Sequence, residues 1–388
     1  MNREGSGVKQ KDEKYICGTY KRQDVLFERG EGSVLIDEEG KRYIDFGGGI
    51  AVNTLGYADD EWIKAVTDQL MRISHTSNLF YTRPQVELAE RLVRRTGMEK
   101  VFFSNSGAEA NEAAVKCARK YSFDKYGEGR YEIITLENSF HGRTMATITA
   151  TGQKVFHNYF MPFLDGFKYV KAGDSKALRE AVGPKTAAIM AELIQGEGGV
   201  EVLDREFVAE IAEICAEKDV LLIVDEVQTG NGRTGSLYCY EQFGLHPDIV
   251  TTAKGLAGGL PLGATMFGKK TAEVLSQGTH GSTFGGNPVC CAAAINVLDR
   301  INDKLLNSVK EKFVLLKQEL ADCPSVRSIS GMGLMIGIEC DDAAGKVELL
   351  RKNGLIVLTA KNKLRLLPPL NISDDTFARG LKILKEVL

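Results

Sequence analysis

Short apolar runs alternate with amphipathic stretches through the middle of the chain. Six of the apolar runs have the length and composition of buried strands, at residues 100–103, 131–136, 187–194, 220–224, 248–252 and 262–267. Amphipathic stretches such as 206–218 lie between several of them and fit helices that cross over the face of a sheet. The pattern predicts an α/β fold with a largely parallel sheet.

The pattern changes near both ends of the chain. Near the start, two alternating strands flank a turn at residues 38–40. After about residue 287 the pattern predicts one long helix, three strands and a final helix, at residues 291–305 and beyond, 328–339, 354–359, 364–367 and from 374. We therefore expect the two ends to build a second, smaller α+β domain together.

These patterns also predict the domain boundaries. We expect a large domain at residues 60–289 and a small domain formed by residues 15–59 and 290–388. Residues 1–14 are mostly polar and charged, so we expect a flexible tail there.

Composition and charge exclude several classes of protein. The chain has 388 residues, of which 43% are hydrophobic and 26% are charged, so it can bury a large core. The formal net charge is -3, and Lys and Arg are spread along the chain, which argues against nucleic-acid and anionic-membrane partners. We find no apolar leader or spanning segment and expect a cytoplasmic protein.

Cysteine and histidine spacing argues against a metal centre. The eight cysteines form no C-x-x-C pair, and the five histidines cluster with none of them, so we expect no bound metal. We also expect no disulfide framework, because the chain is long and has no secretory signal.

Two segments place candidate chemistry after predicted strands. In FFSNSGAEANEAAVK, Ser106, Gly107 and Ala108 open an alanine-rich helix whose free N–H groups can bind an anion. An ordinary capped helix is the alternative. Asp225 and Glu226 end the apolar run of LLIVDEVQTGNGRTG, at the edge where α/β sheets bind ligands, although such an acid also caps loops.

Lys254 is a candidate nucleophile. It follows another apolar run in DIVTTAKGLAGGLPLG, and several glycines follow it. A confined amine can lose its charge and attack a carbonyl carbon, as Schiff-base lysines do, whereas most lysines are only solvated. The candidate residues in the other segments favour the first interpretation more than a lone lysine would.

A second class of function fits part of the same sequence. LLIVDE also fits the strand that holds magnesium in an ATPase, and GATMFGKK at residues 263–270 is one residue short of a P-loop. However, Lys270 stands where a P-loop needs a hydroxyl, and the stretch predicts a strand. A structural or regulatory protein is a third class, and the presence of Lys254, Asp225 and Arg143 argues against it.

Seven segments between about Tyr20 and Leu370 match one known family: SNSGAEANEAAVKCARK, SFHGRTMATITATGQ, QGEGGV, LLIVDEVQTGNGRTG, AKGLAGGLPLGA, GTHGSTFGGNP and RLLPPL. Through these segments the chain resembles class III aminotransferases, which depend on pyridoxal phosphate. This resemblance implies a fold type I enzyme with a mostly parallel seven-stranded sheet in its large domain. It also implies a homodimer whose active sites lie at the subunit interface.

The resemblance implies which residues contact the cofactor. Lys254 would bind the cofactor covalently and then move a proton, and Asp225 would pair with the pyridinium nitrogen. The other implied contacts are Ser106, Gly107 and Ala108 at the phosphate, Thr283 of the neighbouring subunit at the same group, Phe140 and Val227 on the ring faces, Gln228 at the phenolic oxygen, and Glu226.

The resemblance also implies which residues contact the substrates. Arg143 would grip a substrate carboxylate. Glu197 would mask Arg365 when the amino donor enters, and would release it for the second carboxylate of 2-oxoglutarate. Tyr20 and Ser282 are the remaining expected substrate contacts.

The implied reaction moves the δ-amino group of N2-acetyl-L-ornithine to 2-oxoglutarate. Its products would be N-acetyl-L-glutamate 5-semialdehyde and L-glutamate, in arginine biosynthesis. Gly49 leaves room for an acyl group where relatives that use free ornithine carry a tyrosine. Tyr57, Gly48 and Asn231 depart from the usual pattern, which keeps succinylornithine, succinyl-diaminopimelate, ornithine and 4-aminobutyrate as alternative donors.

Overall fold

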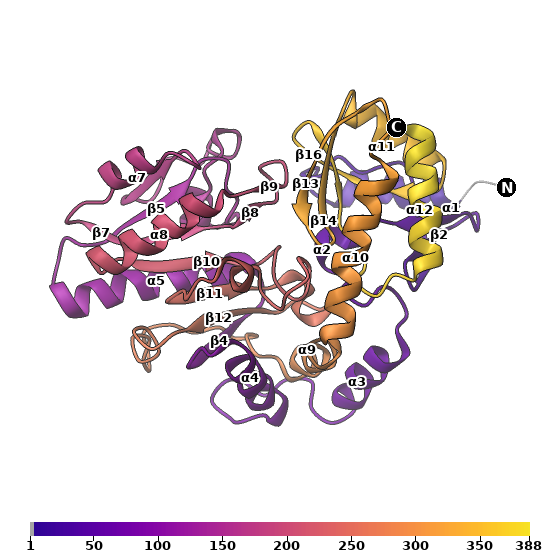
Figure 1. Ribbon diagram of the computed structural model, residues 1–388. Helices are drawn as coiled ribbons and strands as arrows, with labels where there is room; N and C mark the ends of the chain where they lie inside the picture. Colours follow the sequence, from indigo (N-terminus) through magenta and orange to yellow (C-terminus); the bar gives the residue numbers. More distant parts are fainter. Residues whose placement is uncertain (1–3) are drawn as a thin grey trace.

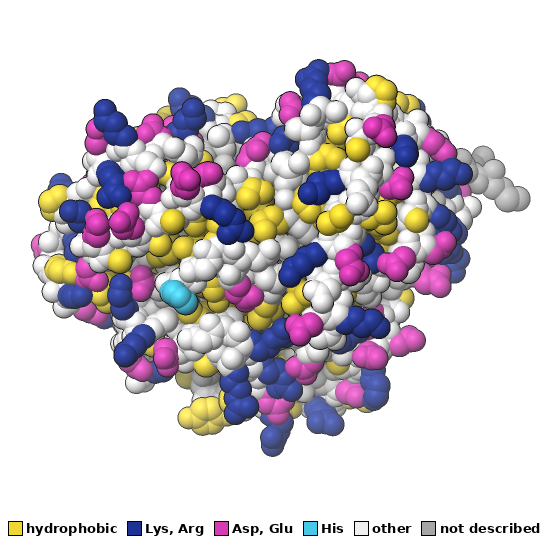
Figure 2. Space-filling model, in the orientation of Figure 1, with side chains coloured by type: hydrophobic (Ala, Val, Ile, Leu, Met, Phe, Trp, Pro, Cys, Tyr) yellow, Lys and Arg dark blue, Asp and Glu magenta, His cyan; other side chains and the backbone are white. Residues whose placement is uncertain are grey.

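The structure is a computed structural model, and it describes residues 4–388 (Figure 1). A larger part surrounds a seven-stranded sheet, and a smaller part contains strands from both ends of the chain. Cationic and anionic side chains are interspersed over the face shown in Figure 2, with no large area of one sign. No helix of the described residues is long and apolar enough to cross a membrane.

The central sheet has six parallel strands and one antiparallel strand. Strand β12 pairs antiparallel with both of its neighbours, and the other pairs are parallel. This arrangement confirms the predicted fold class. The strand order is β4 (Lys100–Ser104), β12 (Gly263–Phe267), β11 (Ile249–Thr252), β10 (Leu221–Asp225), β7 (Thr186–Ala191), β5 (Glu132–Leu136) and β6 (Phe167–Val170).

Burial on both faces explains why apolar runs form this sheet. Leu222 of β10 packs into one buried cluster, and the next residue, Ile223, packs into another. Successive side chains of a strand point to opposite faces, so each face needs its own cover. Helix α8 (Arg205–Lys218) contributes to the first cluster and helix α5 (Gly107–Tyr126) to the second.

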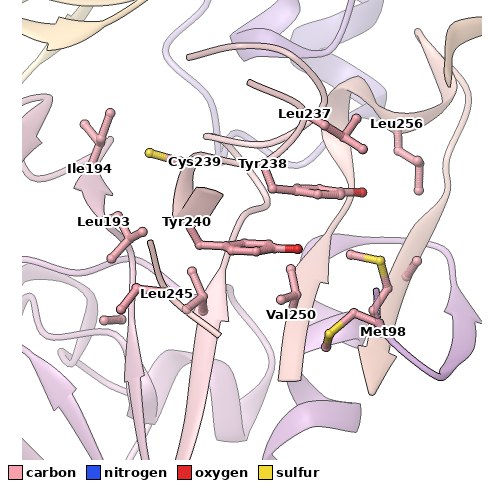
Figure 3. Close-up of a cluster of buried hydrophobic side chains, with 14 of the residues drawn as sticks. Met98, Leu193, Ile194, Leu237, Tyr238, Cys239, Tyr240, Leu245, Val250 and Leu256 are labelled. Carbon is pink, nitrogen blue, oxygen red and sulfur yellow. The ribbon is translucent and has the colours of Figure 1, made fainter. Parts of the chain in front are cut away.

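Figure 3 shows part of the larger cluster, beside the loop that follows β10. The rings of Tyr238 and Tyr240 stack there, with centroids 6.0 Å apart and planes 6° apart. Val250 and Leu256 belong to the same cluster. Close packing of this kind resists displacement, so the loop after β10 has a rigid support.

The smaller part joins the two ends of the chain through strand pairing. Strand β15 (Leu355–Ile356) pairs in parallel with β3 (Arg42–Asp45), although they lie far apart in sequence. Its two sheets have the orders β1 (Phe27–Glu31), β2 (Val34–Asp37), β3, β15, and β13 (Val326–Met332), β14 (Met335–Cys340), β17 (Lys363–Leu366), β16 (Leu358–Ala360). On this pairing we propose the domain division stated above, with residues 60–289 against 15–59 and 290–388.

The remaining helices connect and cover these sheets. Helices α10, α11 and α12 contribute to the separate apolar core of the smaller part. The described helices not yet given, with one short strand pair, are α1 (Glu4–Tyr15), α2 (Gly48–Ala51), α3 (Asp60–Leu70), α4 (Arg83–Thr96), α6 (Met145–Ala150), η1 (Lys154–Phe156), α7 (Ser175–Ala181), β8 (Ile194–Gln195), β9 (Glu201–Val202), η2 (Cys239–Phe243), η3 (Lys254–Ala257), α9 (Pro288–Arg300), α10 (Asp303–Glu319), α11 (Ala343–Lys352) and α12 (Asp374–Val387).

Two elements expected to be continuous are broken in the structure. The long helix expected from residue 291 is α9 followed by α10, because the Asn302 side chain accepts a hydrogen bond from the Leu305 N–H and starts a new helix. The strand expected at 328–339 is the hairpin of β13 and β14, which turns near Gly333, a residue with φ +55°.

The expected tail at residues 1–14 differs from the structure, in which helix α1 runs from Glu4 to Tyr15. Ion pairs join this helix to the segment that follows it, between Lys9 and Asp24 and between Asp12 and Arg22. Two of the charges that suggested a flexible tail therefore have ion-pair partners. Residues 1–3 of the expected tail lie outside the described residues.

The packing of α12 generates a stability prediction. A Cβ atom on Gly380 would lie 2.3 Å from Cζ of Phe46, whose fully buried ring stacks on Phe377. Gly380→Ala is expected to lower the free energy of unfolding by about 1–3 kcal/mol through overpacking. Thermal and urea unfolding measure this loss.

The matched control is Lys382→Ala, on an exposed position of the same helix. Its free energy of unfolding should stay within about 0.5 kcal/mol of the parent value. If Gly380→Ala unfolds at the same midpoint as the parent chain, Phe46 does not pack against Gly380 of α12 as closely as the structure shows.

Candidate active site

A cavity of about 450 Å³ lies at the carboxyl ends of five strands of the central sheet. Residues that follow β4, β5, β7, β10 and β11 all contribute to its wall. This is the edge at which open α/β sheets bind ligands. The lining residues are Val52, Asn105, Ser106, Gly107, Ala108, Asn111, Phe140, His141, Gly142, Arg143, Glu192, Asp225, Val227, Gln228, Ala253, Lys254, Gly259, Leu260, Pro261 and Leu262.

Asp225 is the centre of a buried hydrogen-bond network. It ends β10 and is 3% exposed. Its Oδ2 accepts from Asn111 Nδ2 and lies within hydrogen-bond distance of His141 Nδ1, both at 2.8 Å. Asn111 Oδ1 in turn accepts from Thr251 Oγ1 at 2.7 Å. An ionised carboxylate only accepts hydrogen bonds, so Nδ1 of His141 carries a proton.

His141 was not among the residues expected from the sequence. Its imidazole is fully buried and lines the cavity. Burial disfavours the charged ring, but the hydrogen bond and the charge of Asp225 outweigh burial and raise the pKa of His141. Its Nε2 has no hydrogen-bond partner among the described residues. The signal in the sequence was a histidine next to Phe140, inside a segment that already carried the family resemblance.

Glu192 was also missed. Its carboxyl is buried in the cavity wall, and its Oε2 accepts a hydrogen bond from the Phe140 N–H at 2.8 Å. Burial raises the pKa of Glu192 to about 7, although the charge of His141 opposes this shift. The available signal was a carboxylate inside the apolar run 187–194, because acids are rarely buried unless they are paired or hydrogen-bonded.

Lys254 contributes the only lysine side chain to the described cavity wall. It follows β11 and has a backbone φ of +41°. Residues other than glycine seldom adopt this conformation outside constrained sites. Its amine makes no hydrogen bond or ion pair within the described chain. Burial lowers the pKa of Lys254, while the carboxylates of Asp225 and Glu197 act in the opposite direction.

One end of the cavity is formed by the start of helix α5. Ser106 caps this 20-residue helix by accepting a hydrogen bond from the Glu109 N–H at 3.2 Å. A Cβ atom on Gly107 would lie 2.6 Å from Cγ1 of Val227, so glycine is required where this loop meets the loop after β10. Gly107 and Ala108 thus present backbone N–H groups at the positive end of a helix dipole.

Val227, Gln228 and Phe140 lie in the cavity wall as the sequence predicts, and Glu226 does not. The Glu226 side chain accepts hydrogen bonds from the Thr229 hydroxyl and the Tyr240 N–H, away from the cavity. Burial raises the pKa of Glu226 to about 7. The structure therefore assigns Glu226 a contact with the supporting loop, and its expected cofactor contact is not formed by the described wall.

The residues expected at the substrates fall into two groups. Arg143 lines the cavity directly. Arg365 is buried behind the wall, with its Nη1 2.5 Å from Glu197 Oε1 and 3.4 Å from Gln228 Oε1. Its Nε has no hydrogen-bond partner among the described residues. Glu197 and Arg365 therefore form an ion pair adjacent to a residue of the cavity wall.

Three other expected residues lie outside the described wall. Ser282 stands behind it, where its Oγ accepts a hydrogen bond from Asn105 Nδ2 at 3.2 Å. Thr283 is exposed on the same loop. Tyr20 is 73% exposed, and the Arg22 guanidinium lies 5.7 Å from its ring centroid.

The donor set of the wall fits pyridoxal phosphate, the cofactor that the resemblance implies. An unpartnered amine, a buried carboxylate, a helix N-terminus and apolar side chains match its aldehyde, pyridine nitrogen, phosphate and ring in chemical type. The relevant wall residues are Lys254, Asp225, Gly107, Phe140 and Val227. The described residues contain no group of three or more His, Cys, Asp or Glu placed to hold a metal ion.

The chain is similar in sequence to known aminotransferases over nearly its whole length. The acetylornithine aminotransferase of Haemophilus ducreyi is 51% identical over 385 residues, covering 98% of each chain. That of Caldanaerobacter subterraneus is 46% identical, covering 97% of this chain and 98% of its own.

Solved structures of aminotransferases have a similar fold over most of the chain. The ornithine aminotransferase of Toxoplasma gondii superposes with a TM-score of 0.94 at 32% identity, over 99% of this chain and 94% of that chain. The N-acetylornithine aminotransferase of Stenotrophomonas maltophilia has a TM-score of 0.84 at 35% identity, over 95% and 96%. The model of the aminotransferase class III family matches residues 18–388. The chain therefore belongs to the class III aminotransferases, a family of pyridoxal-phosphate-dependent enzymes.

Proposed function

We propose that this enzyme transfers the δ-amino group of N2-acetyl-L-ornithine to 2-oxoglutarate. The donor's amino group exchanges with the keto oxygen of the acceptor, which gives N-acetyl-L-glutamate 5-semialdehyde and L-glutamate. The observation that carries the proposal is the unpartnered amine of Lys254 in the same cavity as the buried carboxylate of Asp225. The names of relatives at 51% and 46% identity support the choice of donor.

The residues of the cavity divide the chemistry between them. Pyridoxal phosphate, when bound, supplies an aldehyde for the amino group and a ring that withdraws electrons. Asp225, fixed by His141 and Asn111, holds a proton at the pyridine nitrogen. Lys254, with its lowered pKa, takes the proton from the donor's δ-carbon in the first half-reaction. In the second half-reaction it returns a proton to the α-carbon of the new glutamate. Phe140 and Val227 exclude water from the ring faces.

Two arginines allow one cavity to accept two substrates in turn. Arg143 binds a carboxylate in both half-reactions, because it lines the cavity and its guanidinium makes no hydrogen bond or ion pair within the described chain. The ion pair with Glu197 neutralises Arg365 while the donor is bound. When 2-oxoglutarate enters, its second carboxylate competes with Glu197 for the guanidinium.

The acyl group of the donor requires space at the cavity rim. Gly49 lies in the short helix α2, whose next residues lead to Val52 in the wall. Its φ of +62° is in the left-handed region that favours glycine. We propose that the absence of a side chain at Gly49 leaves room for the acetyl group.

We further propose a cytoplasmic homodimer that acts in arginine biosynthesis, with Thr283 reaching the phosphate site of the partner subunit. Large apolar side chains are exposed at residues 79–81, where Leu79 is 87% and Tyr81 is 98% exposed. Phe284, next to Thr283, is also exposed. Its loop lies beside residues 79–81, because Asn78 Nδ2 donates hydrogen bonds to the carbonyl oxygens of Ser282 and Gly285. A surface with this composition fits burial against a second copy of the chain.

A half-reaction assay tests the proposed donor. The cofactor-loaded protein is mixed, without any keto acid, with N2-acetylornithine, ornithine, succinylornithine, succinyl-diaminopimelate or 4-aminobutyrate. N2-acetylornithine is expected to remove the cofactor's visible absorbance fastest. Among these donors, it is the one whose acetyl group is expected to fit the space beside Gly49 while its carboxylate binds Arg143. A faster reaction with another donor would contradict the substrate and keep the reaction class.

The Glu197 and Arg365 pair generates a prediction on the acceptor. Arg365→Lys is expected to raise the KM for 2-oxoglutarate about ten- to hundredfold, because an ammonium cannot reproduce the planar, two-pronged hydrogen bonding of a guanidinium with a carboxylate. The rate of the donor half-reaction should change less than threefold. Stopped-flow measurement of the two half-reactions separates these effects. Equal losses in both would show that Arg365 does not discriminate between the substrates.

The exposed apolar segment generates a prediction on assembly. Replacing Leu79 and Tyr81 together by Glu is expected to raise the dimer dissociation constant at least a hundredfold, since buried charges replace apolar contacts. Sedimentation velocity over a range of concentrations measures this change. Phe123→Glu is the control, because Phe123 is 57% exposed on α5. An unchanged dimer in the double variant would place the interface elsewhere.

A further inference from the structure

We propose that Phe156 is a positioning residue that holds the Arg143 guanidinium in place for the substrate carboxylate. This inference rests on the proposed function, because it assumes that Arg143 binds a carboxylate. Phe156 itself is not part of the cavity wall. Its effect on binding must therefore pass through another residue.

Arg143 lacks the polar contacts that normally fix an arginine. It makes no hydrogen bond or ion pair with any part of the chain that the structure describes, and it is exposed to the cavity that it lines. All five of its N–H donors are consequently free for a ligand. An arginine without contacts samples many rotamers, and ordering them on binding costs affinity.

Aromatic rings replace those missing contacts. The guanidinium carbon of Arg143 lies 4.2 Å from the Phe156 ring centroid and 5.6 Å from the Phe140 ring centroid. The shorter distance lies well inside the range of cation–π contacts, and a guanidinium also stacks on aromatic faces without using its N–H groups. The ring of Phe156 can therefore orient the cation and leave every donor available.

The segment that carries Phe156 is itself fixed at both ends. On its N-terminal side, Gln153 Nε2 donates to the Ser139 carbonyl oxygen at 3.1 Å. On its C-terminal side, His157 Nε2 lies 2.9 Å from the carbonyl oxygen of Ile148 in α6. Phe156 thus belongs to the one-turn helix η1, which is tied to the same loop and helix that flank Arg143.

Phe156 also touches Phe140, which gives the alternative to be tested. The two ring centroids lie 5.5 Å apart at an interplanar angle of 70°, an edge contact. If the contact with Phe140 were the important one, loss of the Phe156 ring would disturb the cofactor face and lower kcat for every substrate. If the contact with Arg143 is the important one, only carboxylate binding weakens. The first outcome therefore changes kcat, and the second changes the dissociation constant of a carboxylate.

The test measures the binding of glutarate, an unreactive dicarboxylate, to the cofactor-loaded enzyme by calorimetry. Phe156→Leu is expected to raise the dissociation constant about three- to tenfold, as loss of a cation–π contact predicts. Phe156→Tyr keeps the ring and should bind within twofold of the parent. Phe123→Leu, at an exposed phenylalanine of α5, is the matched control.

Kinetics and spectra complete the test. Phe156→Leu should raise the KM for N2-acetylornithine and for 2-oxoglutarate by a similar factor, with kcat within twofold and the visible spectrum of the bound cofactor unchanged. A lower kcat with a shifted spectrum and unchanged glutarate binding would assign the ring to Phe140 and overturn the proposal. Unchanged glutarate binding in Phe156→Leu alone would overturn it as well.

Arg143→Lys separates this inference from the proposed function. It should weaken glutarate binding more than Phe156→Leu does, because it removes the guanidinium itself. If Arg143→Lys binds glutarate normally, Arg143 does not bind a carboxylate, and the substrate assignment fails together with the inference. If it binds weakly while Phe156→Leu is normal, the substrate assignment stands and only the role of Phe156 falls.

Discussion

The hydrogen-bond network around Asp225 is the constraint on which the rest of the site depends. Asp225 ends β10, Asn111 comes from α5, His141 follows β5 and Thr251 belongs to β11. The network thus links the ends of β10 and β5 to α5 through the Asp225 carboxylate, and α5 to β11 through Asn111. Because the network is buried, any other arrangement of these elements would leave polar groups without hydrogen-bond partners, at a cost in free energy. The network therefore favours a single arrangement.

That arrangement also sets the charge balance of the cavity. The amine of Lys254 shares a confined space with Asp225 and Glu192, and its burial lowers its pKa even though these acids oppose the shift. Burial raises the pKa of Glu192 to about 7, so the site does not accumulate full negative charge at neutral pH. The lowered pKa of Lys254 favours the neutral amine, the form that can act as a nucleophile or base. In the proposed function, the fixed part of the cavity holds the cofactor, while Arg143 in the wall and Arg365 behind it bind the substrates.

Six strands of the central sheet were predicted, because they are short, largely buried apolar runs. The edge strand β6 was missed, because it is only partly buried and carries a lysine within its short run. The strand-end residues Asp225 and Lys254 could be found, since the chemistry follows directly after each apolar run. The break between α9 and α10 was not predicted, because Asn302 caps a helix only in the context of a turn that the apolar periodicity does not mark. Helix α1 was missed because its ion-pair partners Asp24 and Arg22 lie outside the helix.

The contacts within the site could be predicted only in part. His141 and Glu192 act through residues that are distant in sequence, and pairings of this kind are not visible in local patterns. Glu226 differs from its neighbour Asp225, because Asp225 lines the cavity whereas the Glu226 side chain accepts hydrogen bonds within the loop after β10. The local sequence does not show which of two adjacent acids faces a cavity. The family resemblance supplied the pairing of Glu197 with Arg365, which the structure shows at 2.5 Å.

Borohydride reduction of the cofactor-loaded protein, followed by peptide mapping in a mass spectrometer, tests most directly whether this cavity performs the chemistry. Reduction makes any bond between a lysine amine and the cofactor permanent. If the buried, unpartnered amine beside Asp225 is the reactive group, the reduced cofactor will be found on Lys254 and on no other lysine. Attachment to a different lysine, or no attachment at all, would contradict the role of Lys254 and the division of chemistry built on it.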